Sequence, residues 1–220
     1  MRLVFASLIA VALAVPATFA LQQDADVAVA NGGIHVPGWK GIAEGGDINE
    51  SRITGEGGTL ELATGPAATY WSPENMASGD YTISATFTEA SQKAPHPHPF
   101  GLFIGGKALG TDSQSFLYCV AYRNGIYLVR GFRGSEVFTV SARGASHAAV
   151  HQGEADASVT QEIAWRVSGG TAECLVNGQV VGSYGQSDLV GDGKLESTDG
   201  VFGIRIGHNV EATVTGFGKK

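Results

Sequence analysis

The sequence predicts an all-β protein folded as a two-sheet antiparallel jelly-roll sandwich. Two observations lead to this prediction: apolar and polar residues alternate along many short segments, and turns rich in glycine and asparagine separate those segments. Alternation with a period of two is typical of a strand that buries one face. Many short strands with almost no helical pattern favour a sandwich or a barrel.

The alternation is clearest from Tyr81 to Phe87, where threonine and serine separate four apolar residues. The same pattern predicts these strands in chain order: Thr59–Ala63, Ala68–Trp71, Tyr81–Phe87, Phe100–Ile104, Phe116–Tyr122, Ile126–Arg130, Val137–Val140, Glu162–Val167, Thr171–Val176, Gln179–Tyr184, Val201–Ile206 and Ala212–Phe217. The alanine-rich segment Arg143–Ala157 is expected to be a loop with one helical turn at most.

Glycine-containing pairs mark the turns between these strands. Asn124-Gly125 and Asn177-Gly178 each separate two expected strands, and both residue types tolerate the positive φ of a tight hairpin turn. Gly169-Gly170 closes a third hairpin. The turns therefore indicate that consecutive strands are antiparallel.

Residues 1–20 have the organisation of a signal peptide. Arg2 precedes an apolar run over residues 3–15, and the small residues Thr18 and Ala20 form a cleavage site after Ala20. No later segment has the roughly 20 apolar residues that span a bilayer. We therefore expect residues 21–220, which contain no linker, to form one secreted or periplasmic domain with no membrane insertion after cleavage. A retained, uncleaved anchor is the alternative.

The charge of the chain argues against nucleic acid as a partner. The formal net charge is −7, and the 14 lysines and arginines are scattered, with Lys219-Lys220 the one adjacent pair. Binding to a phosphate backbone needs clustered basic residues. The low charge and the 32 glycines indicate many tight turns and a polar, uncharged surface instead.

Cys119 and Cys174 both lie in expected strands. An oxidising compartment would allow them to form one disulfide, provided that their strands are neighbours. Two buried thiols are the alternative, and the sequence leaves both open.

The order of several motifs resembles a known family. Gly38-Trp39 is followed by Tyr70-Trp71, then by Trp165-Arg166-Val167, by Val176-Asn177-Gly178 and by a Gly203–His208 segment before the last strand. This order is similar to concanavalin-like jelly rolls of bacterial exported proteins, in particular the 3-keto-disaccharide hydrolase family. The resemblance covers most of residues 39–217. It implies the jelly-roll fold, a carbohydrate partner and cleavage of 3-keto sugars.

The acidic residues do not supply the usual glycosidase chemistry. Two paired carboxylates would be needed, and the nearest approach to the required E-x-D-x-x-E strand is Glu154-Ala155-Asp156. A 3-keto sugar needs only one base, because its ketone acidifies the neighbouring C2 proton. His208 is the candidate base, with Arg205, Arg123 and Arg130 as candidate groups that polarise the ketone. Strand alternation, however, predicts that Arg205 and His208 face opposite sides.

Histidines also suggest a metal site. His96 and His98 alternate with prolines just before a strand, and an extended backbone would point both imidazoles to one side. Such a pair is a candidate set of ligands for a divalent metal ion. A loop that proline merely stiffens is the alternative.

Aromatic residues suggest a binding face instead. Tyr118 and Tyr122 share one face of their strand, Arg130 lies on the next strand, and Trp71 is a further candidate for ligand contact. Three functions stay open: an enzyme that cleaves 3-keto glycosides, a non-catalytic glycan-binding or envelope interaction module, and a structural exported domain. In the last case these aromatic side chains would be core.

Overall fold

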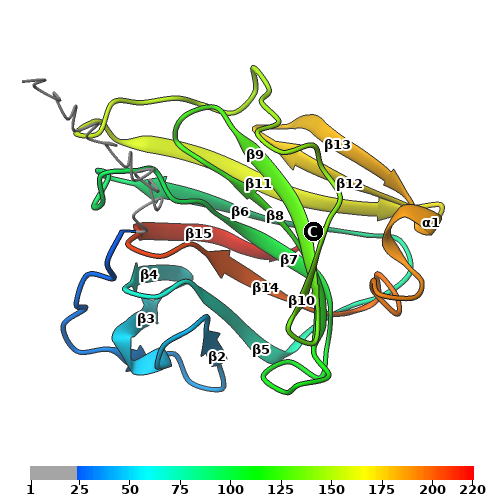
Figure 1. The fold of residues 1–220 in the computed structure, drawn as a ribbon, viewed down its shortest axis with the longest axis horizontal. Coiled ribbons are helices and arrows are strands. Elements are labelled where there is room, and N and C mark those ends of the chain that lie inside the picture. The colour runs from blue at the N-terminus through cyan, green and yellow to red at the C-terminus, as the bar shows by residue number, and fades with distance from the viewer. Residues whose placement is uncertain (1–23) are drawn as a thin grey trace, which may run out of the picture.

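A computed structural model of the chain describes residues 24–220. The predicted signal peptide lies outside the described residues. The remaining chain forms two curled β-sheets packed face to face, and the prediction of a two-sheet jelly-roll sandwich is confirmed (Figure 1).

The larger sheet has eight strands. In spatial order they are β1 (Gly33–Ile34), β3 (Ser51–Glu56), β4 (Thr59–Thr64), β15 (Glu211–Lys219), β6 (Tyr81–Glu89), β11 (Val159–Ser168), β12 (Thr171–Val176) and β13 (Gln179–Gly185). All neighbours are antiparallel except β1 and β3, which pair in parallel.

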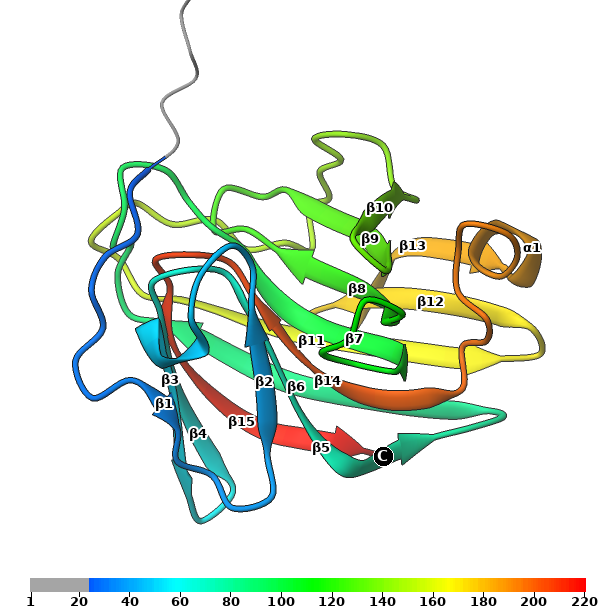
Figure 2. The same cartoon turned by 60° about the horizontal axis from the view of Figure 1, so that its bottom comes forward.

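The smaller sheet has seven strands, all paired antiparallel. In spatial order they are β10 (Glu136–Thr139), β9 (Tyr127–Arg133), β8 (Ser115–Ala121), β7 (Phe100–Lys107), β14 (Gly200–Ile206), β5 (Ala68–Ala77) and β2 (Lys40–Ala43). Figure 2 shows this sheet curling, with β2 and β10 at its two edges.

The core lies between the sheets and follows the alternation of the strands. On β7, Phe100, Leu102 and Ile104 point inward, while Phe103 belongs to a separate apolar cluster on the outer face of the seven-stranded sheet. From the opposite sheet, the fully buried Trp165 donates its indole N–H to the backbone oxygen of Leu102 at 3.1 Å. This bond satisfies the one polar atom of the indole across the sandwich.

A disulfide joins Cys119 on β8 to Cys174 on β12, with their Cα atoms 6.1 Å apart. These strands belong to different sheets. The disulfide therefore does not need the neighbouring strands that were expected from the sequence, because two strands that face each other across the core bring side chains equally close.

Every strand expected from the sequence is present, several with longer ends. Strands β1, β2 and β3 were not predicted, because they are short and contain glycine or charged residues that interrupt the alternation. Segment 143–157 has turns and isolated bridges but no helical turn; the short helices are instead η1 (Ile48–Glu50) and α1 (Gln186–Leu189). Within residues 24–220, no helix combines the length and apolarity needed to cross a membrane.

Candidate functional site

A groove of about 350 Å³ lies on the outer face of the seven-stranded sheet. Residues from both edges line it, from Glu44 after β2 to Val137 on β10, because the sheet curls. The polar side chains in its lining are Glu44, His98, Tyr118, Tyr122, Arg130, Arg205 and His208. Concave sites with an apolar base and a few convergent polar groups are typical of ligand-binding sites.

Aromatic rings form the base of the groove. Tyr118 and Phe132 lie with ring centroids 6.1 Å apart, and Phe116 packs 5.0 Å from Phe132 beside them. These three rings lie on the outer face of the sheet. On β8, Phe116 and Tyr118 alternate with Leu117 and Cys119, which point into the core.

Of the four predicted ligand-contacting residues, Tyr118, Tyr122 and Arg130 line the groove. Trp71 belongs to the same outer-face apolar cluster but is 5% exposed and does not line the groove. Its predicted role is therefore reduced to packing beneath the neighbouring surface.

The side chain of Arg205, on β14, extends across the neighbouring strand β7. Its partner on β7 is Gly101, which has no side chain, so the guanidinium reaches the rings of Tyr118, 5.5 Å away, and Phe132, 5.8 Å away. These distances are within the range of cation–π attraction. One guanidinium nitrogen is paired with Glu44 and another donates to Thr69 Oγ1 at 3.3 Å, which keeps the buried charge compensated.

The two groove tyrosines keep their hydroxyl protons. Burial raises the pKa of Tyr118 and of Tyr122, and the positive charges of Arg205 and Arg130 oppose that rise without cancelling it. Both phenols can therefore donate as well as accept hydrogen bonds near neutral pH.

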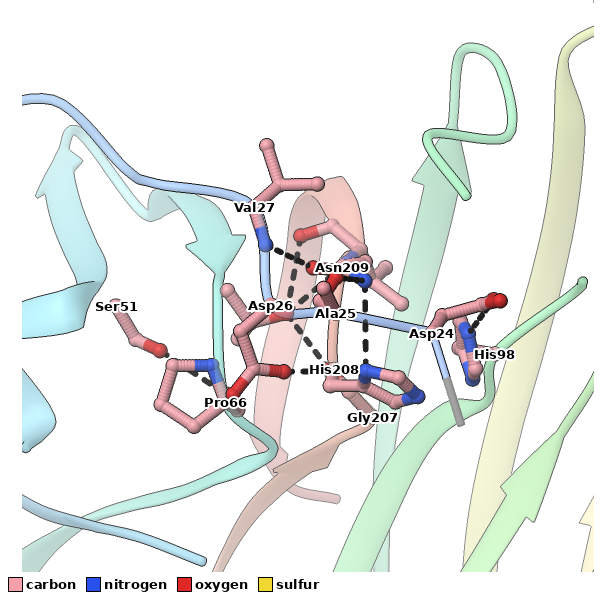
Figure 3. Close-up of polar contacts among 12 residues, drawn as sticks. Asp24, Ala25, Asp26, Val27, Ser51, Pro66, His98, Gly207, His208 and Asn209 are labelled. Atoms are coloured by element: carbon pink, nitrogen blue, oxygen red, sulfur yellow. Dashed lines mark hydrogen bonds and ion pairs between the residues drawn. The ribbon is translucent and has the colours of Figure 1, made fainter. Parts of the chain in front are cut away.

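Two histidines meet at one end of the groove. The rings of His98 and His208 have centroids 3.7 Å apart. His98 Nε2 lies 3.3 Å from a carboxylate oxygen of Asp24, and His208 Nδ1 lies 3.2 Å from one of Asp26 (Figure 3). The segment that carries both aspartates is held by Asn209, which accepts from the Val27 N–H at 2.7 Å and donates to the Ala25 carbonyl at 2.9 Å.

Arg205 and His208 line the same groove, so the expectation that they face opposite sides was wrong. The reason is that β14 ends at Ile206, and His208 lies in the turn that follows, where alternation no longer applies. Burial lowers the pKa of His98, and the neighbouring His208 lowers it further, while Asp24 opposes both effects. His98 is therefore neutral at neutral pH.

The structure places Arg123 elsewhere, which corrects its predicted role beside the substrate. Its side chain is buried and paired with Glu89 at 3.1 Å, and the guanidinium donates to the carbonyls of Gly153, Glu154 and Ala157. It does not line the groove. A guanidinium with these partners stabilises the loop at residues 153–157 and does not contact a ligand in the groove.

The predicted metal site at His96 and His98 does not form as expected. The backbone bends at Ala94, Pro95 and His96, so His96 is exposed to solvent while His98 faces the groove. Within residues 24–220, no three side chains of His, Cys, Asp or Glu are grouped as metal ligands. The described donors therefore do not fit the divalent metal ion that the sequence suggested.

No protein-family model matches the chain, and no curated protein sequence matches it either. Among solved structures, carbohydrate-binding module CBM66 from Bacillus subtilis is similar with a TM-score of 0.58 and 9% identity, over 85% of this chain and 98% of that one. A Bacillus subtilis protein with a galectin-like fold has a TM-score of 0.55 and 14% identity, over 82% and 88%. A glycosyl hydrolase candidate from Parabacteroides distasonis has a TM-score of 0.50 and 15% identity, over 90% and 99%.

At such low identities the similarity shows the fold alone. The chain is a jelly-roll sandwich with a galectin-like fold and a groove on the outer face of its seven-stranded sheet. This supports the jelly-roll part of the family resemblance, whereas membership of the 3-keto-disaccharide hydrolase family stays a prediction.

Proposed function

We propose that this protein binds carbohydrate in the groove of the seven-stranded sheet. The observation that carries the proposal is the convergence of Tyr118, Tyr122 and two guanidinium groups on one concave surface. A sugar ring has an apolar C–H face that packs on aromatic rings, and hydroxyl groups that planar polar side chains can bind. The groove offers both kinds of contact side by side.

The fold adds support of a general kind. One of the similar solved structures is a carbohydrate-binding module, and its similarity extends over 98% of its length. Its ligand is not transferred to this chain, because residues in the site and not the fold decide what is bound. The groove residues named above carry the proposal for this protein.

Tyr122 provides the most direct test of carbohydrate binding. It is half-buried at the groove, so Tyr122→Ala removes a contact surface with little disturbance of the core. We expect the dissociation constant of a bound oligosaccharide to rise about tenfold, as when a central tyrosine is removed from an interface. A glycan array of neutral and acidic oligosaccharides identifies the sugars that the wild type binds. Calorimetric titration with these sugars then measures the dissociation constants.

Tyr184→Ala is the matched control, since Tyr184 is half-buried on β13 in the other sheet. It should leave the affinity unchanged, and thermal unfolding should show that both variants are folded. Unchanged affinity in Tyr122→Ala would place the sugar elsewhere, and a wild-type protein that binds no sugar on the array would refute the proposal.

The histidine pair favours a second candidate function, cleavage of a 3-keto glycoside. In the tautomer that carries its proton on Nδ1, His208 donates to the Asp26 carboxylate and keeps Nε2 as the basic nitrogen. His208 would take the C2 proton, the electron pair would form a C1–C2 double bond, and the C1–O bond would break. The leaving oxygen then takes up a proton, and water adds to the double bond.

His208→Gln tests this second function. A general base contributes about 10²–10⁴-fold, so turnover of a 3-keto disaccharide should fall at least a hundredfold. His151→Gln is the control, because His151 is exposed in a loop outside the groove. Wild-type protein that binds the sugar and leaves it intact would reduce the function to binding.

A further inference from the structure

Arg130 is a groove residue whose charge has no counter-ion in the part of the chain that the structure describes. It lies on β9 directly opposite Tyr118 on β8, and its side chain lines the groove. Its Nε atom is buried and has no hydrogen-bond partner among the described residues. Within residues 24–220, no carboxylate lies within ion-pair distance of this guanidinium.

Arg130 differs in this respect from the buried arginines of the same protein. Arg123 is paired with Glu89, and Arg205 is paired with Glu44. Among the described residues that line the groove, Glu44 is the one carboxylate, and it is already paired with Arg205. The groove therefore keeps one uncompensated positive charge, in a protein whose formal net charge is −7.

A partly buried guanidinium without a partner is costly, because it loses water without gaining a counter-ion. The guanidinium presents its N–H groups as a planar fork that matches the oxygens of a carboxylate or a sulfate. The surrounding Tyr118, Tyr122 and Phe132 lower the local polarity, which strengthens such a contact.

We propose that the groove selects acidic sugars, with Arg130 binding a carboxylate or sulfate ester on the glycan while the sugar ring packs on the neighbouring tyrosines. This inference rests on the proposed carbohydrate binding and names the class of ligand. Arg205 is not the anion-binding residue, since Glu44 and Thr69 already accept from its guanidinium.

The experiment uses pairs of ligands that differ only in charge. Oligogalacturonides, oligoglucuronides and oligomannuronates are each titrated beside their methyl esters, and sulfated galacto-oligosaccharides beside the unsulfated forms. We expect at least one acidic ligand to bind about tenfold or more tightly than its neutral counterpart. The pair that shows this difference identifies the anion as carboxylate or sulfate.

Arg130→Gln should remove the preference for the acidic form, so that the acidic and the neutral form bind this variant with equal affinity. Arg130→Lys keeps the positive charge and loses the planar fork of N–H donors, so it should retain part of the preference for the acidic form. Arg166→Gln is the charge-matched control, because Arg166 lies on β11 in the other sheet and pairs with Glu173 at the surface. It should keep the full preference.

Two results would overturn the inference while carbohydrate binding stands: neutral forms that bind wild type as tightly as acidic ones, or a preference that persists in Arg130→Gln. The first comparison needs no variant, so it holds even if a substitution impairs folding. If neither form of any sugar binds wild-type protein, the proposed function itself fails.

Discussion

Replacing Cys119 and Cys174 together by alanine is expected to lower the free energy of unfolding by about 4 kcal/mol. The disulfide closes a long loop, with a sequence separation of 55, so it restricts the unfolded chain strongly. For a domain of this size the loss corresponds to a fall in Tm on the order of 10 °C. Chemical denaturation of wild type and variant measures the difference.

The same bond can be tested without any substitution. Both cysteines are fully buried, so a reductant reaches them only when the sandwich opens. We expect wild type to unfold at a lower denaturant concentration when a thiol reductant is present, and the double variant to be insensitive to it. Two titratable thiols in unfolded, unreduced protein would contradict the disulfide.

Arg123→Leu is expected to destabilise the protein by about 3–5 kcal/mol, the usual cost of breaking a buried ion pair. The substitution leaves the buried Glu89 carboxylate without its partner at 3.1 Å. It also removes the donor to the carbonyls of Gly153, Glu154 and Ala157. Thermal and denaturant unfolding give the size of the effect.

Two further variants show whether the buried charge is responsible. Arg123→Leu combined with Glu89→Leu should recover part of the stability, because no unpaired charge stays in the core. Arg166→Leu breaks an exposed pair with Glu173 and should cost about 1 kcal/mol or less. An Arg123→Leu protein as stable as Arg166→Leu would mean that the loop finds other partners.

Part of the candidate site was predictable from strand periodicity. Alternation alone placed Tyr118 and Tyr122 on one face of their strand, and both line the groove together with Arg130 from the next strand. Alternation is a local property, because successive side chains of a strand point to opposite faces whatever the strand pairs with. The same reasoning failed for His208, which lies beyond the end of its strand, and for His96, where the backbone bends.

The role of Arg123 could not be found in this way. It stands beside an Asn-Gly turn, where an exposed side chain is expected, yet it pairs with Glu89 at the end of β6. An ion pair between residues distant in the chain leaves no periodic signal. Sequence patterns also do not show that Arg130 Nε lacks a partner among the described residues, because this depends on which side chains from other segments surround it.

The sequence by itself determined most of the strands, the hairpin turns and therefore the all-β class, since these depend on residues within a few positions of one another. Only the tertiary structure decided that β14 lies between β5 and β7, that Cys119 faces Cys174 across the core, and that His98 meets His208. Strand order and sheet curvature follow from burying apolar faces of segments far apart in the chain. The groove is a product of that curvature, so its residues were predictable one by one but their convergence was not.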